Sequence, residues 1–135
     1  MLYLDSNVFI YATINTKALG ENARALLQKI QQGEEKAETS ALTFDEVFWA
    51  IRKHGQEAAF EACQALLNLP NLEIAAFDRE LALSALQLIK QYHLAPRDAI
   101  HAATAILGKA DIIVSTDAHF DKIKELKRQS LEAES

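Results

Sequence analysis

The run Leu2-Tyr3-Leu4-Asp5-Ser6-Asn7 decides the fold, because three apolar residues are followed at once by a carboxylate and two small polar residues. Short apolar runs with polar boundaries are typical of buried strands. The same arrangement recurs far along the chain, where Ile112-Ile113-Val114 leads into Ser115-Thr116-Asp117. The two runs predict two buried strands, each with an aspartate just beyond its carboxyl end.

The sequence between these runs alternates helical and strand-like patterns. Apolar residues at helical spacing, with caps and breakers, predict helices over about 6–12, 21–31, 43–55, 56–68, 78–93 and 96–108. Shorter apolar runs predict strands over 36–40 and 72–77. Strands separated by helices need crossover connections, so the expected fold class is α/β with a mostly parallel sheet covered on both faces. We expect one domain over residues 1–131 and a frayed tail over 132–135.

Four acidic residues stand out in this frame. In parallel sheets the working site lies beyond the carboxyl ends of the strands, where Asp5 and Asp117 are both predicted. Asp98 interrupts an Ala-rich helix, and a buried carboxylate seldom lacks a partner because desolvation costs several kcal/mol. With Glu46, these carboxylates would repel one another in a shared pocket. Mg²⁺ or Mn²⁺ suits such an all-oxygen site.

Each carboxylate also has a structural alternative. Asp5 could cap the helix that follows it, and Asp117 could cap a short helical turn. Glu46 stands at capping-box spacing from Thr43. Asp98 lies in the first turn of its helix, where the helix dipole favours negative charge.

Bulk composition narrows the function classes. The net charge of −5 argues against a passive nucleic-acid-binding module, and argues less against a nuclease whose metals offset carboxylates. The single cysteine, Cys63, cannot form an internal disulfide and suits a reducing compartment. The sequence has no signal-peptide pattern and no apolar run near the ~20 residues of a membrane span. We therefore expect a soluble cytoplasmic protein with no membrane partner.

The positions of the acidic residues exclude two other α/β folds that have an acidic pocket. A phosphoacceptor receiver domain usually carries paired acids after its first strand, and here Asp5 stands alone. A haloacid-dehalogenase-type hydrolase needs a second aspartate two residues after the first, and Asn7 occupies that position.

Four segments together resemble the motifs of the PIN domain family, in the family's order and over essentially the whole chain. They are Leu4-Asp5-Ser6-Asn7-Val8-Phe9-Ile10, Thr43-Phe44-Asp45-Glu46-Val47, Arg97-Asp98-Ala99-Ile100-His101-Ala102-Ala103-Thr104-Ala105 and Ser115-Thr116-Asp117-Ala118-His119-Phe120-Asp121. The resemblance implies a PIN-like three-layer α/β/α sandwich and an endoribonuclease that hydrolyses RNA with Mg²⁺ or Mn²⁺. A chain this short is most similar to the VapC-type toxin of a VapBC toxin–antitoxin pair. That similarity implies a homodimer and a cognate antitoxin protein.

The resemblance also assigns roles to residues. It implies that Asp5, Glu46, Asp98 and Asp117 are the catalytic quartet, and that the three aspartates are the metal ligands. Glu46 would act through a water or orient the nucleophile.

Supporting roles follow from the same resemblance. Asn7 and Thr116 would fix the carboxylates. Asp121 matches a fifth acid found in many members, which supports a second metal or a water, or is a surface residue. Apart from the resemblance, Lys53 and Arg97 are candidate RNA contacts because they lie near Glu46 and Asp98; the alternatives are a solvated helix end for Lys53 and an acidic neighbour for Arg97.

Three expectations complete the sequence-based picture. His101 is expected to make a buried structural hydrogen bond, and Trp49 to pack in the core or a dimer, with base stacking as its alternative. The last strand of the family could come only from the polar residues 126–131, which predicts a weak sheet edge. The alternative function is a non-catalytic PIN-like module that binds RNA or protein.

Overall fold

Five parallel strands form the central sheet of the computed structural model, which describes residues 1–132. The strands are β1 (Leu2–Leu4), β2 (Ala37–Ser40), β3 (Leu72–Ala75), β4 (Ile112–Val114) and β5 (Lys127–Gln129). Their order in the sheet is β3-β2-β1-β4-β5, so the first strand of the chain is the central one. The predicted parallel sheet is therefore confirmed.

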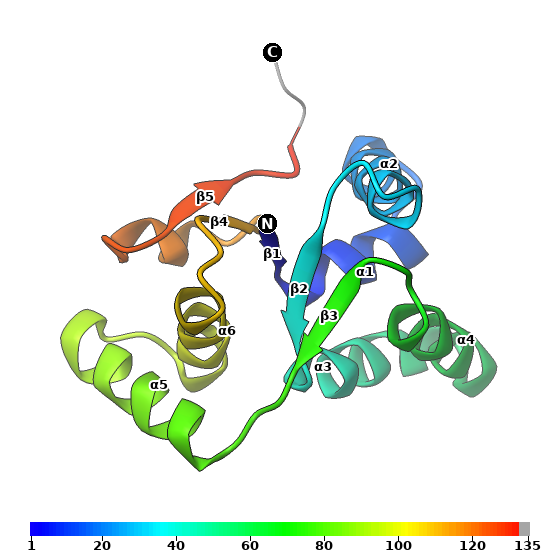
Figure 1. The fold of residues 1–135 in the computed structure, drawn as a ribbon. Coiled ribbons are helices and arrows are strands. Elements are labelled where there is room, and N and C mark those ends of the chain that lie inside the picture. The colour runs from blue at the N-terminus through cyan, green and yellow to red at the C-terminus, as the bar shows by residue number, and fades with distance from the viewer. Residues whose placement is uncertain (133–135) are drawn as a thin grey trace.

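Helices cover both faces of the sheet. They are α1 (Ser6–Ile14), α2 (Ala18–Gln31), α3 (Leu42–Ile51), α4 (Gln56–Leu67), α5 (Arg79–Tyr92) and α6 (Pro96–Leu107), with 3-10 turns η1 (Arg52–His54) and η2 (Ala118–Lys122). Helices α1 to α4 pack together on one face, and α5 pairs with α6 on the other (Figure 1). This is the three-layer α/β/α sandwich that the resemblance implies. Among the described residues, no helix has the length and apolar character to cross a membrane.

The two faces have separate hydrophobic cores because side chains alternate along each strand. Leu2 and Leu4 of β1 join the core beneath α1 to α4. Tyr3, between them, points into the core beneath α5 and α6 with Ile113 and Phe120. One three-residue strand thus anchors both layers.

The carboxyl ends of all five strands meet at one edge of the sheet. Helix α1 follows β1 there, α3 follows β2, and η2 follows β4. Helix α6 leads into β4 by a short turn and runs opposite to it, so its first turn lies at the same edge. The segments carrying the four predicted acids are thereby brought to one end of the molecule.

The predicted last strand is present. The polar segment 126–131 supplies it, since β5 pairs with β4 from Ile112↔Lys127 to Val114↔Gln129, with Leu126 and Leu131 buried on either side of it. The predicted weakness of this sheet edge stays a prediction. Of the predicted tail over 132–135, residues 133–135 lie outside the described part of the chain.

The capping box predicted between Thr43 and Glu46 is absent from the structure. Helix α3 begins one residue earlier, at Leu42, with no side-chain cap bond at its N-cap residue, Ala41. The Thr43 side chain is fully buried, and its hydroxyl bonds to Thr39 Oγ1 at 2.7 Å. Glu46 is therefore free of a capping role.

Candidate active site

Asp5 is the most buried of the four predicted acids. Its Oδ1 accepts a hydrogen bond from Ser6 N at 2.7 Å, which caps α1. Its Oδ2 accepts one from Ser115 Oγ, also at 2.7 Å. Burial raises the pKa of this carboxyl, while His101 and the two hydrogen bonds act in the opposite direction. The carboxylate is held rigidly at the end of the central strand.

His101 joins Asp5 to Glu46. Its Nε2 lies 2.5 Å from Glu46 Oε1 and 3.5 Å from Asp5 Oδ1, and its Nδ1 lies 2.7 Å from the Tyr3 hydroxyl. Because a carboxylate only accepts hydrogen bonds, His101 Nε2 donates to Glu46. In a neutral ring the other nitrogen, Nδ1, then accepts a hydrogen bond from the Tyr3 hydroxyl. Burial lowers the pKa of His101, but the Glu46 bond and the Asp5 charge outweigh it and the net shift is upward. The expected buried hydrogen bond is present, and it ends on a predicted site residue.

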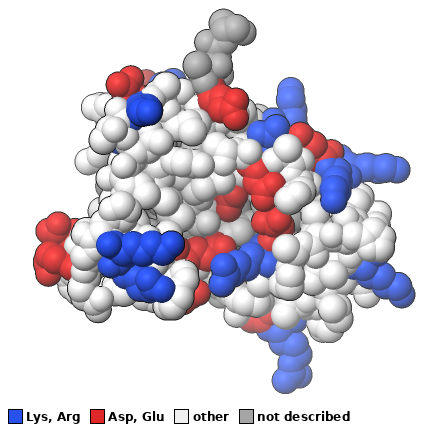
Figure 2. Space-filling model, turned by 180° about the vertical axis from the view of Figure 1, so that it is seen from behind, with Lys and Arg blue, Asp and Glu red and all other residues white. Residues whose placement is uncertain are grey.

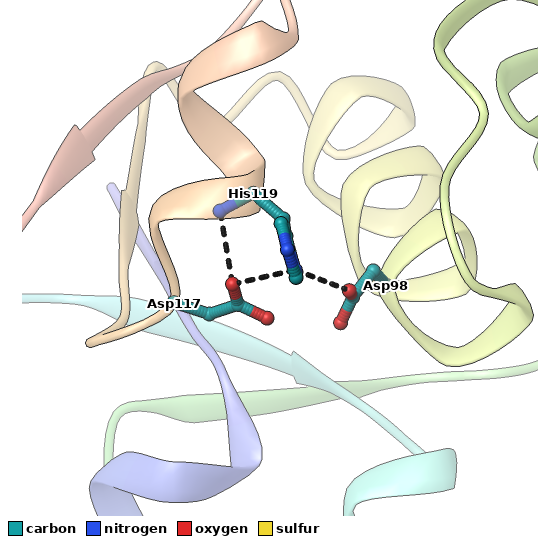
Figure 3. A group of neighbouring side chains, drawn as sticks. All are labelled: Asp98, Asp117 and His119. Carbon is teal, nitrogen blue, oxygen red and sulfur yellow. Dashed lines mark hydrogen bonds and ion pairs between the residues drawn. The ribbon is translucent and has the colours of Figure 1, made fainter.

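Asp98 and Asp117 form the second half of the site with His119. One ligand atom from each of the three side chains lies within 4.8 Å of the other two. Figure 3 shows the imidazole between the two carboxyl groups, with Asp98 projecting from α6 and Asp117 from the end of β4. The pKa of Asp98 is raised to about 6, first by burial and then by the charges of Asp117 and Asp5.

The two halves of the predicted quartet are neighbours. The Asp5 charge raises the pKa of Asp98, and the Asp98 charge raises that of His101. Asn7, which follows β1, has a buried Oδ1 atom with no hydrogen-bond partner among the described residues. Mutually repelling carboxylates and an unsatisfied amide oxygen are the donor set that a hard divalent cation prefers. Of the predicted ligands, Asp98 and Asp117 have carboxylate oxygens close enough to share such an ion, and the charge of Asp5 acts on Asp98.

Ser115 is a supporting residue that the sequence patterns did not reveal. Besides donating to Asp5, its hydroxyl accepts a bond from Asp117 N at 2.9 Å and lies 3.3 Å from Asn7 Nδ2. The same amide of Asn7 donates to Thr116 Oγ1 at 2.9 Å. Asn7 and Thr116 thus tie β1 to β4, and Ser115 bridges the two aspartates. Its place directly after a buried strand and two residues before Asp117 is the signal that could have pointed to it.

Asp121 is exposed and forms an ion pair with Arg128. It pairs with Arg128, whose Nε and Nη2 lie 2.9 and 3.2 Å from its two carboxylate oxygens. The Arg128 bond holds the pKa of Asp121 below its usual range. Arg128 also donates to Ser115 O, so the pair connects β5 to the turn that carries Asp117.

The basic and aromatic residues considered as RNA contacts are all exposed. Lys53 and Arg97 are exposed, as candidate RNA contacts must be. Trp49 is 60% exposed and stacks against Arg52, whose guanidinium carbon lies 3.3 Å from the ring centroid, so core packing of Trp49 is wrong. Figure 2 shows acidic side chains gathered in a hollow of one face, with lysine and arginine side chains around it.

Comparisons with known proteins agree with this architecture. The family described as PIN domain matches residues 2–126. No curated protein sequence matches the chain.

Similar solved structures include VapBC2 from Rickettsia felis bound to a promoter DNA fragment (TM-score 0.73, 20% identity, 96% of this chain and 98% of that chain). Mycobacterium tuberculosis VapC20, described as a sarcin–ricin loop cleaving toxin, has a TM-score of 0.74 at 14% identity, covering 90% and 93%. A toxin–antitoxin complex from Klebsiella pneumoniae has a TM-score of 0.68 at 21% identity, covering 94% and 96%. At these identities the likeness establishes a shared fold.

Proposed function

The chain belongs to the PIN domain family, and on that basis we propose that it is a metal-dependent endoribonuclease that hydrolyses RNA phosphodiester bonds. We propose further that it is the toxin of a VapBC-type toxin–antitoxin pair, in keeping with the toxins among its structural neighbours. One observation carries the proposal: carboxylates from β1, α3, α6 and the end of β4 converge at one edge of the sheet, with Asp98 and Asp117 close enough to share a cation.

Each side chain has a task in this reaction. Asp5, Asp98 and Asp117 would hold the ion, and the Ser115 and Ser6 bonds fix the orientation of Asp5. A bound Mg²⁺ or Mn²⁺ would make water easier to deprotonate and offset charge on the phosphate. Glu46, oriented by its bond to His101, positions the attacking water. Exposed Lys53 and Arg97 attract the RNA backbone.

Neutralising one ligand tests the proposal. Asp98→Asn keeps the size of the side chain and removes its charge, so RNA cleavage in Mn²⁺ should fall by at least about 100-fold. The matched control is Asp45→Asn, which neutralises an exposed acid on α3 next to Glu46 and should cleave at the parent rate. Cleavage of a labelled single-stranded RNA, with and without EDTA, is the measurement. Equal rates for Asp98→Asn and the parent would overturn the assignment.

Metal binding separates this enzyme from a non-catalytic module. Because metal relieves repulsion among the carboxylates, millimolar Mn²⁺ should raise the melting temperature of the parent chain and of Asp45→Asn. Asp98→Asn should respond less. A parent chain that neither binds Mn²⁺ nor cuts RNA would be a binding module.

The proposal includes partners and a compartment. An apolar cavity of about 390 Å³ lies between α1, α2 and α4, lined in part by Phe9, Leu27 and Leu66, and we assign it to an apolar segment of the antitoxin. We also propose a homodimer. Buried, unpaired Cys63 and an RNA substrate favour the cytoplasm.

A further inference from the structure

His119 occupies an unusual position for an exposed histidine. Its side chain is 66% exposed, yet its ring lies between the carboxyl groups of Asp98 and Asp117. Its Nδ1 lies 3.0 Å from Asp117 Oδ1 and 3.8 Å from Asp98 Oδ2 (Figure 3). The imidazole therefore stands between two carboxylates that come from different elements of the fold.

The local backbone fixes this orientation. Asp117 is the N-cap residue of η2, and its Oδ1 accepts the backbone N–H of His119 at 2.9 Å. The same oxygen thus meets both the backbone nitrogen and the ring nitrogen of His119. The buried side chain of Phe120, next in the chain, anchors the turn in the core beneath α5 and α6. A ring held in this way needs little reorganisation to become a ligand.

We propose that His119 is a direct metal ligand that makes this site prefer Mn²⁺ over Mg²⁺. The inference rests on the function proposed above, and it adds a nitrogen donor to the carboxylate set. Mg²⁺ favours oxygen ligands and keeps several waters, so it gains little from an imidazole. The affinity of divalent first-row transition metals for sites with nitrogen and oxygen donors rises from Mn²⁺ to the later metals. Mn²⁺ lies at the weak end of this series but still gains more from an imidazole than Mg²⁺ does. The ligand atoms of Asp98, Asp117 and His119 already lie within 4.8 Å of one another.

The other role open to this histidine is that of a surface counter-charge to Asp117. That role would favour neither metal, because it involves no bond to the ion. The two roles therefore differ in the ratio of Mn²⁺ to Mg²⁺ affinity and in the presence of nitrogen in the coordination sphere. Both quantities can be measured without RNA.

The first measurement is calorimetric titration of each metal into the parent chain and His119→Gln. Gln keeps a polar side chain but has no imidazole nitrogen. We expect Mn²⁺ affinity to fall at least about tenfold while Mg²⁺ affinity changes less than about twofold. The matched control, His54→Gln, removes an exposed histidine of η1 and should leave both affinities unchanged. An equal loss for both metals in His119→Gln, or no loss for either, would overturn the inference.

The second measurement is pulsed EPR of the Mn²⁺-loaded chain. Coordination by His119 should produce nitrogen-14 modulation that is present in the parent and in His54→Gln and absent in His119→Gln. Modulation that survives in His119→Gln would assign the nitrogen to another residue, such as His101, and overturn the inference. Mn²⁺ binding without nitrogen modulation would also overturn it while leaving the metal site intact. A parent chain that binds no Mn²⁺ at all would instead contradict the proposed function.

Discussion

At the scale of single residues, Ser115 shows how the site is held together. One hydroxyl donates to Asp5 and accepts from the backbone of Asp117, and so connects the ends of β1 and β4. Asp5 would otherwise be a carboxylate that is only 6% exposed, with an oxygen left unpaired. Burying an unpaired acceptor costs about 1–3 kcal/mol, more for a charged group.

Removing this hydroxyl should therefore affect both activity and stability. For Ser115→Ala we expect RNA cleavage to fall about 10- to 100-fold, as for other groups that orient ligands. Unfolding in urea should show a loss of about 1–3 kcal/mol. Ser84→Ala on α5, a half-buried serine outside the site, is the control and should change neither quantity. A variant with parent activity would show that Asp5 does not depend on Ser115 for its orientation.

Site residues could be predicted from the sequence where their position is set by neighbouring residues. Asp5 and Asp117 could be found because each directly follows a recognisable apolar run. The partners of Ser115 and His101 could not be predicted, since their bonds to Asp5 and Tyr3 cross 110 and 98 positions of the chain. Such bonds depend on strand register and helix packing, which neither propensity nor spacing determines.

At the scale of elements, the packing of β2 against α6 contains a buried acid. Glu38 is only 7% exposed, and its Oε1 has no hydrogen-bond partner among the described residues. It fits because Gly108, at the end of α6, has no side chain: a Cβ there would lie 2.2 Å from Glu38 Oε1. Burial, assisted by the Glu73 charge on neighbouring β3, raises the pKa of Glu38 to about 7.

This acid should make folding stability depend on pH. The folded chain binds the Glu38 proton more tightly than the unfolded chain, whose ordinary pKa is 4.5. The stabilisation that this bound proton gives the folded chain is therefore fully present below about pH 4.5 and is lost as the pH rises through about 7. Glu38→Gln, which imitates the protonated form, should be more stable than the parent at pH 8 by on the order of 1–3 kcal/mol. The difference should shrink toward zero at pH 5.

Urea unfolding at both pH values is the measurement. Glu57→Gln on α4, which replaces an exposed glutamate, should match the parent at both pH values. A Glu38→Gln variant whose advantage is equal at pH 5 and pH 8 would show that the carboxyl does not titrate between them.

Elements were predictable where the pattern is local. Helices α5 and α6 follow from Asp78 as a side-chain cap and from Pro96 in the first turn, and both were anticipated to within a residue or two. Strand β5 was hard to predict because its residues Lys127, Arg128 and Gln129 are polar, as in a solvated segment. Pairing with β4 and the Arg128 bond to Asp121 override that polarity, and both are tertiary contacts.

At the scale of the whole molecule, α5 leaves an apolar stripe uncovered. Leu83 and Leu86 are 58% and 60% exposed and lie three positions apart, so they are neighbours on one helix face. Exposed apolar residues grouped in this way mark interaction surfaces. We propose that the homodimer suggested above would form through this stripe.

Charges on that stripe should separate the subunits. Leu83→Glu combined with Leu86→Glu should convert a dimer to a monomer in light scattering after size-exclusion chromatography, with the far-UV circular dichroism unchanged. Phe60→Glu on α4 is the matched control, because Phe60 is 56% exposed on the opposite layer. If Phe60→Glu dissociates the dimer and the α5 variant does not, the interface lies on α3 and α4 instead.

The central place of β1 has a consequence for the timing of synthesis. Among the five strands β1 is made before the others, and its partner β4 follows more than 100 residues later. A growing chain therefore contains Asp5 and Glu46 long before it contains Asp117. For the nuclease proposed here, a nascent chain has no complete cutting centre until the ribosome has passed Asp117.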